Sequence, residues 1–130
     1  MANIPTFTAV FHPWHCDTMG HVNTRHYAAV FDDASLHMLA PISPDRPDLG
    51  WADVTCKLTY RREITAGTCV QVVSRVNEIG TRSMSINHTM KSIDATEVFA
   101  EAEVKIVRFD KQSRSAVPIE DAIKAKLTPI

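Results

Sequence analysis

The chain has 130 residues, of which 45% are hydrophobic and 22% are charged, and its formal net charge at pH 7 is -1. This near-neutral balance excludes a strongly basic nucleic-acid binder and a highly charged disordered segment. The length suits a single domain, residues 1–130, which buries roughly two-thirds of the surface that the unfolded chain exposes.

The sequence also bears on the compartment. No run of residues is long and apolar enough to span a membrane, and residues 1–13 lack the pattern of a secretory signal. The three cysteines, Cys16, Cys56 and Cys69, are odd in number and have no C-x-x-C spacing, which favours reduced thiols. We therefore expect a cytoplasmic protein without disulfides and without a membrane partner.

The first half of the chain predicts a strand, a loop and a long helix. Residues 7–14 are rich in aromatic and β-branched side chains, which favours a strand that ends or lies at an edge near Pro13. Apolar residues then recur at helical spacing from residue 24 to about residue 39, and Pro41 and Pro44 forbid continuation of the helix. Asn23 or Thr24 can cap the free amides of its first turn.

The second half predicts four consecutive strands. Period-two alternation marks residues 51–62 as a half-buried strand, and it recurs over residues 69–77, 83–90 and 98–106. Gly80 supplies one of the reversals between them, and His88, on an apolar strand face, is best read as a core histidine with satisfied hydrogen bonds. Pro118 at a first helical position predicts a short terminal helix. Ala100 and Ala102 are small enough to let a helix lie close across the sheet.

One long helix packed on one antiparallel sheet is the simplest way to bury both apolar faces, so the fold class is α+β. Five strands on one helix leave sheet edges uncovered, and these favour a dimer.

The stretch that carries chemistry is the loop before the long helix, residues 15–23. Asp17 is separated from the helix by the flexible Gly20, so the loop can fold the carboxylate back toward the amides and the positive dipole end of the helix. An acid that faces N–H donors is suited to the chemistry of a carbonyl group. The plain alternative is that Asp17 only caps a turn, as loop aspartates often do.

The run C-D-T-M-G-H-V-N-T-R-H-Y, followed by A-A-V-F-D-D-A, resembles the signature of the hot-dog-fold acyl-CoA thioesterases of the 4-hydroxybenzoyl-CoA thioesterase family. The match comprises Asp17, Gly20, His21, Val22, Asn23, Tyr27, Phe31 and Ala34. Two departures are Thr24, where many relatives have a second asparagine, and Ser35, where a basic residue is common. The resemblance implies a five-stranded antiparallel sheet wrapped around one long central helix, with a short C-terminal helix.

The resemblance further implies hydrolysis of an acyl-CoA, in which coenzyme A is part of the substrate and no other cofactor is needed. Asp17 would be the catalytic carboxylate, acting as nucleophile or as general base, and amides at the helix start near Thr24 would polarise the carbonyl. Asn23 and His21 complete the catalytic set, with His21 fixing the loop. Substrate contacts are expected from Gly20, Tyr27, Thr59, Arg82 and Ser83. Active sites would lie between the subunits of a homodimer, which often assembles into a homotetramer as a dimer of dimers.

Four alternative interpretations remain, of which the first two use residues around Asp17. Cys16 beside His12, His15 and His21 could be a thiolate nucleophile, although a free cysteine more often packs as a small hydrophobe. The same histidines could bind a metal, but His12 and His15, if they lie on a strand, point to opposite faces, so no metal site is expected. A hydratase or dehydratase acting on acyl thioesters and a non-catalytic acyl-CoA-binding domain are the remaining alternatives.

Overall fold

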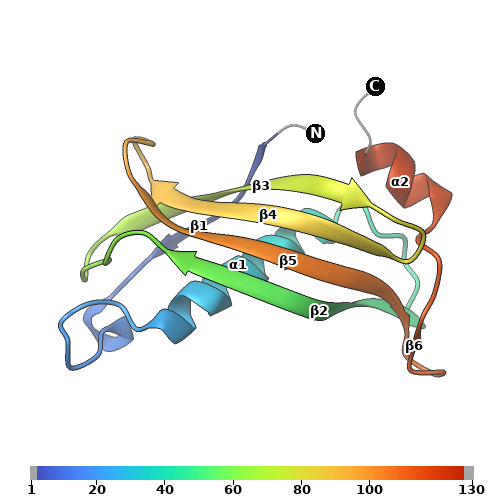
Figure 1. Cartoon of the computed structure of the whole chain (residues 1–130), viewed down its shortest axis with the longest axis horizontal. Coiled ribbons are helices and arrows are strands. Elements are labelled where there is room, and N and C mark those ends of the chain that lie inside the picture. The colour runs from blue at the N-terminus through green and yellow to red at the C-terminus, as the bar shows by residue number, and fades with distance from the viewer. Residues whose placement is uncertain (1–2, 128–130) are drawn as a thin grey trace.

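The computed structural model describes residues 3–127, which form one antiparallel sheet with a long helix against one of its faces (Figure 1). The strands are β1 Ile4–Val10, β2 Leu49–Tyr60, β3 Cys69–Ile79, β4 Ser83–Ser92, β5 Val98–Asp110 and the short β6 Ser115–Ala116. The helices are the 3-10 helix η1 Pro13–His15, the long α1 Thr24–Leu39 and the terminal α2 Asp121–Leu127. The strand order is β1-β3-β4-β5-β2, and β6 pairs with β5. The predicted α+β class and the span of the long helix are thus confirmed.

The helix and the inner face of the sheet form one hydrophobic core. The side of α1 that repeats at helical spacing is buried, as predicted, through Tyr27, Val30, Phe31, Ala34 and Met38. It meets alternate residues of β3, β4 and β5, which include Val72, Ile86, Ala100, Ala102 and Ile106. Each large aliphatic side chain removed from water here stabilises the fold by roughly 1.5 to 3 kcal/mol. No helix of residues 3–127 is long and apolar enough to cross a membrane.

A chain of polar side chains crosses this core. His88 is 1% exposed, and its Nε2 lies 2.8 Å from Ser35 Oγ while its Nδ1 lies 2.6 Å from Ser74 Oγ. Ser74 Oγ in turn lies 2.7 Å from Thr6 Oγ1, whose hydroxyl donates to the carbonyl oxygen of Val72. The consistent arrangement of donors is therefore Ser35 to His88 Nε2, His88 Nδ1–H to Ser74, and Ser74 to Thr6. The prediction of a satisfied core histidine is confirmed.

The ends of the chain depart from the predicted boundaries. The first strand ends at Val10 rather than near residue 14, because Pro13 begins η1 instead of closing a strand. The terminal helix begins at Asp121, so the prediction that Pro118 starts it was wrong. The amide of Ile119 donates to the carbonyl of Thr81 at 2.8 Å, and this bond holds the segment extended against the sheet.

A buried ion pair fixes the start of α2. The guanidinium of Arg108 is 2% exposed and donates to both carboxylate oxygens of Glu120, at 2.7 and 2.9 Å. It also donates to the carbonyl of Gly50 and lies 4.8 Å from the ring centroid of Trp51. The hydrogen bonds to Arg108 hold the pKa of Glu120 below its usual range. Both charges are thereby satisfied, as a buried pair requires.

The strand β2 is less buried than its alternation predicts. Val54 is 55% exposed, and Cys56 and Tyr60 are also exposed. A bulge between Asp53 and Thr55 shifts the register of β2 against β5. Since β2 is the last strand of the sheet and α1 packs mainly against β1, β3 and β4, the inner face of β2 is only partly covered within the described chain. Trp51 and Leu58 pack against the core, whereas Cys56 and Tyr60 stay exposed. The described chain therefore has an apolar edge strand that is open to a partner.

The buried histidine makes stability dependent on pH. Burial lowers the pKa of His88 to about 4 from the ordinary value of 6.5, so the folded state disfavours the protonated ring. This contribution is fully present above pH 6.5 and is lost as the pH falls toward 4. Between pH 7 and pH 5, the free energy of unfolding should fall by about 2 kcal/mol more in the wild type than in His88→Gln. Urea titrations at both pH values measure this difference, and the exposed control His37→Gln should follow the wild type. An equal pH dependence in His88→Gln would contradict a neutral buried ring.

Candidate active site

The loop that precedes α1 is closed by its own backbone. The amide of Asp17 donates to the carbonyl of His21 at 3.1 Å, and the amide of Gly20 donates to the carbonyl of Asp17 at 3.0 Å. Gly20 has a φ of 84°, in the left-handed region that side chains disfavour, although a Cβ there would meet nothing within 4 Å. Glycine is thus required by backbone conformation rather than by space, and the turn presents the Asp17 side chain in one orientation.

Two donors hold the carboxylate of Asp17. Its Oδ1 accepts from the amide of Met19 at 2.9 Å, and its Oδ2 accepts from the side-chain amide of Asn23 at 3.1 Å. These hydrogen bonds, the one from Met19 first, lower the pKa of Asp17 below its ordinary value. The group is therefore an ionised, partly exposed carboxylate at neutral pH. It can serve as a nucleophile or as a base.

Asn23 connects this carboxylate to the helix. Its side-chain oxygen accepts from the amide of Arg25 at 3.1 Å, so Asn23 rather than Thr24 is the N-cap of α1. The backbone N–H of Asn23 donates to the carbonyl of His15 at 2.9 Å. Thr24 is the first helical residue, and its backbone N–H has no acceptor within residues 3–127. An unpaired amide donor at the positive end of α1 thus lies next to the residue that holds Asp17.

A cleft of about 230 Å³ opens beside the helix start. It is lined by His21, Val22, Thr24, Tyr27, Tyr60, Arg62 and Glu63. The hydroxyl of Tyr27 donates to the carbonyl of Arg62 at 3.3 Å, and burial raises the pKa of that hydroxyl. Its ring packs edge-on against Tyr60 with centroids 5.3 Å apart. The cleft therefore has aromatic walls and a polar mouth, as expected of a site for a small organic group.

The loop is also tied to the end of β2. The amide of Val22 donates to the carbonyl of Ile64 at 2.8 Å, and His21 Nδ1 lies 3.3 Å from the carbonyl of Val22, to which it can donate. The role of His21 in fixing the loop stays a prediction. Tyr60 and Glu63 line the cleft but were not predicted as site residues, because nothing local in the sequence places the end of a strand beside a loop forty residues earlier.

Other predicted substrate contacts lie elsewhere in the protomer. Thr59 points to the outer face of the sheet, since it pairs with Glu101, whereas Tyr60 pairs with the buried Ala100. Arg82 and Ser83 lie at the β3–β4 turn, at the end of the sheet opposite the Asp17 loop (Figure 1). Within one protomer the structure brings together Asp17, Gly20, His21, Asn23, Thr24 and Tyr27, but not Thr59, Arg82 or Ser83.

The structure also shows where the residues of the alternative metal site and of the alternative Cys16 nucleophile lie. His12 and His15 lie on the turn of η1 rather than on a strand, and His15 Nδ1 accepts from the amide of His12 at 2.8 Å, so the predicted opposite-face geometry was wrong. The described residues contain no group of three or more His, Cys, Asp or Glu side chains that could hold a metal ion. The thiol of Cys16 has only a 3.9 Å contact, to the carbonyl of His12, and no histidine ring activates it in the described chain. All three cysteines are free.

Solved structures share this fold over nearly the whole chain. A 1,4-dihydroxy-2-naphthoyl-CoA thioesterase from Synechocystis superposes with a TM-score of 0.83 at 11% identity, covering 97% of this chain and 96% of that one. A Staphylococcus aureus protein in complex with CoA gives 0.85 at 14% identity, covering 100% and 89%. A predicted thioesterase from Bacillus stearothermophilus gives 0.82 at 21% identity, covering 97% and 94%. At these identities the likeness shows the hot-dog fold alone.

The comparison of sequences is more specific. No curated protein matches the chain. The family model of the thioesterase-like superfamily matches residues 11–127, which include the whole Asp17 loop, α1 and the sheet from β2 onward. The chain therefore belongs to the thioesterase-like superfamily and is a thioester hydrolase.

Proposed function

We propose that the protein hydrolyses an acyl-CoA to the free acid and coenzyme A, with Asp17 as the reacting carboxylate. The observation that carries this proposal is the attachment of Asp17, through Asn23, to the start of α1, where the N–H of Thr24 has no acceptor in the described chain. A carboxylate and a free amide donor at one helix end are the two groups that attack on a thioester needs.

Two balanced routes use these groups. Asp17 can attack the thioester carbon, releasing the coenzyme A thiolate and leaving a mixed anhydride that water opens. Alternatively, it can take a proton from a water molecule that attacks the same carbon. In both routes negative charge develops on the carbonyl oxygen, and the Thr24 amide at the helix start is suited to stabilise it. In other acyl-transfer enzymes, one well-placed donor of this kind lowers the activation free energy by about 3 to 4 kcal/mol.

The cleft and the relatives support an acyl-CoA as the substrate. The aromatic rings of Tyr27 and Tyr60 suit the acyl group, and the exposed Arg62 at the mouth, which also pairs with Glu97 at 3.2 Å, suits an anionic portion of coenzyme A. One structural relative is named as a thioesterase of an aromatic acyl-CoA, and another is a complex with CoA. Coenzyme A is then part of the substrate, and no further cofactor is required.

We further propose that two protomers pair along β2. The apolar side chains of Val54, Cys56 and Tyr60 are exposed on this edge strand, whose second edge has no neighbour in the described chain. A two-fold axis between two copies of β2 reverses the strand direction, so the partner's β3–β4 turn comes to the same end of the joint sheet as Asp17. This arrangement would explain how Arg82 and Ser83, distant in one protomer, could serve a shared site. We assign such a homodimer to the cytoplasm.

The first test removes the charge of Asp17. Asp17→Asn should lower kcat by about 100- to 10,000-fold, because the amide can neither attack nor accept a proton. Thiol release with Ellman's reagent, over a panel of short, long and aromatic acyl-CoAs, measures this loss and also identifies the acyl group. Asp33→Asn, an exposed carboxylate on α1 away from the cleft, is the matched control and should retain wild-type turnover. Near-normal thiol release by Asp17→Asn would remove Asp17 from the mechanism.

The second test concerns Asn23. Its amide helps to lower the pKa of Asp17, so Asn23→Ser should raise that pKa and move the acid limb of the pH–rate profile to higher pH. Serine retains a helix cap, whereas Asn23→Ala loses it as well, at a cost of about 1 kcal/mol in stability. The two variants should shift the acid limb equally, while only Asn23→Ala loses stability. That result would separate the effect of the hydrogen bond to Asp17 on the pKa from the effect of the helix cap on stability. An unshifted limb in both variants would mean that Asn23 does not tune Asp17.

The third test addresses pairing along β2. Val54→Asp places a charge on the exposed apolar edge and should halve the mass measured by sedimentation equilibrium. Ile93→Asp, at a side chain with 54% exposure on the β4–β5 turn, is the matched control and should leave the mass unchanged. A wild-type chain that sediments as a monomer, or an unchanged mass in Val54→Asp, would exclude this edge as the interface.

A further inference from the structure

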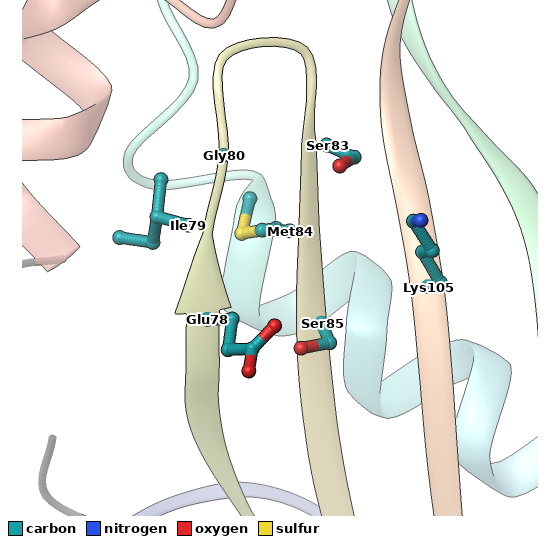
Figure 2. Close-up of a pocket in the computed structure, with 7 residues that line it drawn as sticks. All are labelled: Glu78, Ile79, Gly80, Ser83, Met84, Ser85 and Lys105. Carbon is teal, nitrogen blue, oxygen red and sulfur yellow. The ribbon is translucent and has the colours of Figure 1, made fainter.

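The hollows outside the cleft at the start of α1 differ in what they adjoin. A hollow of about 390 Å³ at the β3–β4 turn is lined by side chains of β3, β4 and β5, which Figure 2 shows around the hairpin. Another hollow, of about 240 Å³, lies between β1 and α1, and its lining includes Phe11, His15, His26 and Asp33. His15 is the last residue of η1, directly before the Asp17 loop. This second hollow therefore adjoins the candidate site, although none of its lining residues lines the cleft.

The backbone of His15 joins the two ends of the Asp17 loop. Its carbonyl accepts from the backbone N–H of Asn23 at 2.9 Å. Directly inside this bond, Cys16 and Val22 face each other in an isolated antiparallel bridge. The loop is therefore a narrow hairpin whose outermost bond connects His15 to Asn23, the residue whose side chain holds the carboxylate of Asp17.

The imidazole ring of His15 holds the preceding turn. Its Nδ1 accepts from the backbone N–H of His12 at 2.8 Å, and the backbone N–H of His15 donates to the carbonyl of His12 at 3.0 Å. A ring nitrogen accepts a hydrogen bond only when it carries no proton, so the turn requires the neutral ring with its proton on Nε2. Protonation of Nδ1 would set two donors against each other and break the bond to His12.

The groups around the ring are mostly positive or able to become so. The His12 ring lies 5.8 Å away on η1, and the ring of His26 on α1 packs edge-on at 4.8 Å, both measured between centroids. Arg25 donates to Nε2 of His26 at 3.3 Å. Asp33 on α1 is the carboxylate that lines the same hollow, to which β1 contributes only apolar side chains. Whatever the balance of these charges, a protonated His15 ring has no acceptor for the His12 N–H, so acid weakens the turn.

We infer that His15 is a positioning residue for thioester hydrolysis, whose neutral ring and backbone keep Asn23, and through it Asp17, at the start of α1. The inference rests on the proposed role of Asp17. The path runs from the His12 N–H through the His15 ring and carbonyl to Asn23 and then to the carboxylate. Histidine changes its charge between pH 5 and pH 8, so the first bond of the path is sensitive to pH in this range. The pKa of Asp17 lies below its ordinary value of 3.8, so Asp17 itself stays ionised there.

The pH dependence of kcat tests the inference. In the wild type, kcat should fall by about tenfold from pH 8 to pH 5, the effect of one lost hydrogen bond, whereas KM should change little because His15 does not line the cleft. His15→Asn, whose side-chain oxygen can accept from the His12 N–H without titrating, should keep the wild-type kcat at pH 8 and lose the fall. His15→Leu has no acceptor, and its kcat should be about tenfold lower at pH 8. Loss of thioester absorbance measures turnover at both pH values.

A control and three outcomes make the test decisive. His26→Asn removes a neighbouring histidine but leaves the bond to His12, so it should retain the fall. The inference is overturned by a wild-type kcat that is constant between pH 8 and pH 5, by a fall that persists in His15→Asn, or by wild-type turnover in His15→Leu. Circular dichroism establishes that each variant is folded. If His15→Leu does not fold, the comparison of the wild type with His15→Asn decides alone.

NMR spectroscopy gives a readout that does not depend on turnover. The ring nitrogens of His15 should show an unprotonated Nδ1 at pH 8, and the Asn23 amide should exchange with solvent faster in His15→Leu than in the wild type or His15→Asn. A proton on Nδ1 at pH 8, or equal exchange in all three proteins, contradicts the inference. If Asp17→Asn retains turnover, the proposed function fails and the positioning role fails with it. If Asp17→Asn is inactive but the His15 variants keep the wild-type kcat and pH profile, only the inference fails.

Discussion

The side-chain amide of Asn23 is the contact on which the candidate site depends. Its oxygen caps α1 through the amide of Arg25, while its nitrogen donates to the carboxylate of Asp17. One residue therefore sets both the start of the helix and the orientation of the acid. Because the planar amide has its donor and acceptor in fixed directions, the carboxylate cannot move far from the helix start without losing a hydrogen bond. The two hydrogen bonds of the Asn23 side chain thus keep the carboxylate of Asp17 close to the positive end of the helix dipole.

The rest of the fold holds this local unit in place. The buried face of α1 fixes the helix on the sheet, and the bond from Val22 to the carbonyl of Ile64 joins the loop to the chain beyond β2. The chain of hydrogen bonds through His88 then ties the middle of α1, at Ser35, to β4 and β3. An apolar contact alone would permit the helix to slide along the sheet. Directional bonds to a buried imidazole favour one position of α1, which also fixes its N-terminus.

Local sequence patterns predicted the parts of the molecule that local physics determines. The helical spacing from Tyr27 to Met38 and the alternation along β4 and β5 both match the burial observed in the fold. These side chains are buried by packing against a single apolar layer, so the periodic pattern alone predicts which of them face the core. The position of Asp17 near the start of α1 could be predicted for the same reason, because the hydrogen bonds to its carboxylate come from Met19 and Asn23, both close to it in sequence. The start of α2 could not be predicted from local patterns. Arg108 and Thr81, which lie outside this segment of the sequence, hold the residues after Pro118 extended.

The exposure of β2 is the most informative disagreement with the sequence. Its alternating pattern predicts a half-buried strand, but Cys56 and Tyr60 stay exposed in the protomer because α1 packs mainly against β1, β3 and β4. Exposed apolar side chains on an edge strand form a ready template for pairing with a further strand. The cleft beside the start of α1 lies at the end of this same strand, where Tyr27 and Tyr60 both line it. If two protomers pair along β2, as proposed above, the second copy would extend the sheet next to the strand end that lines this cleft, so the sheet and the site would be completed together.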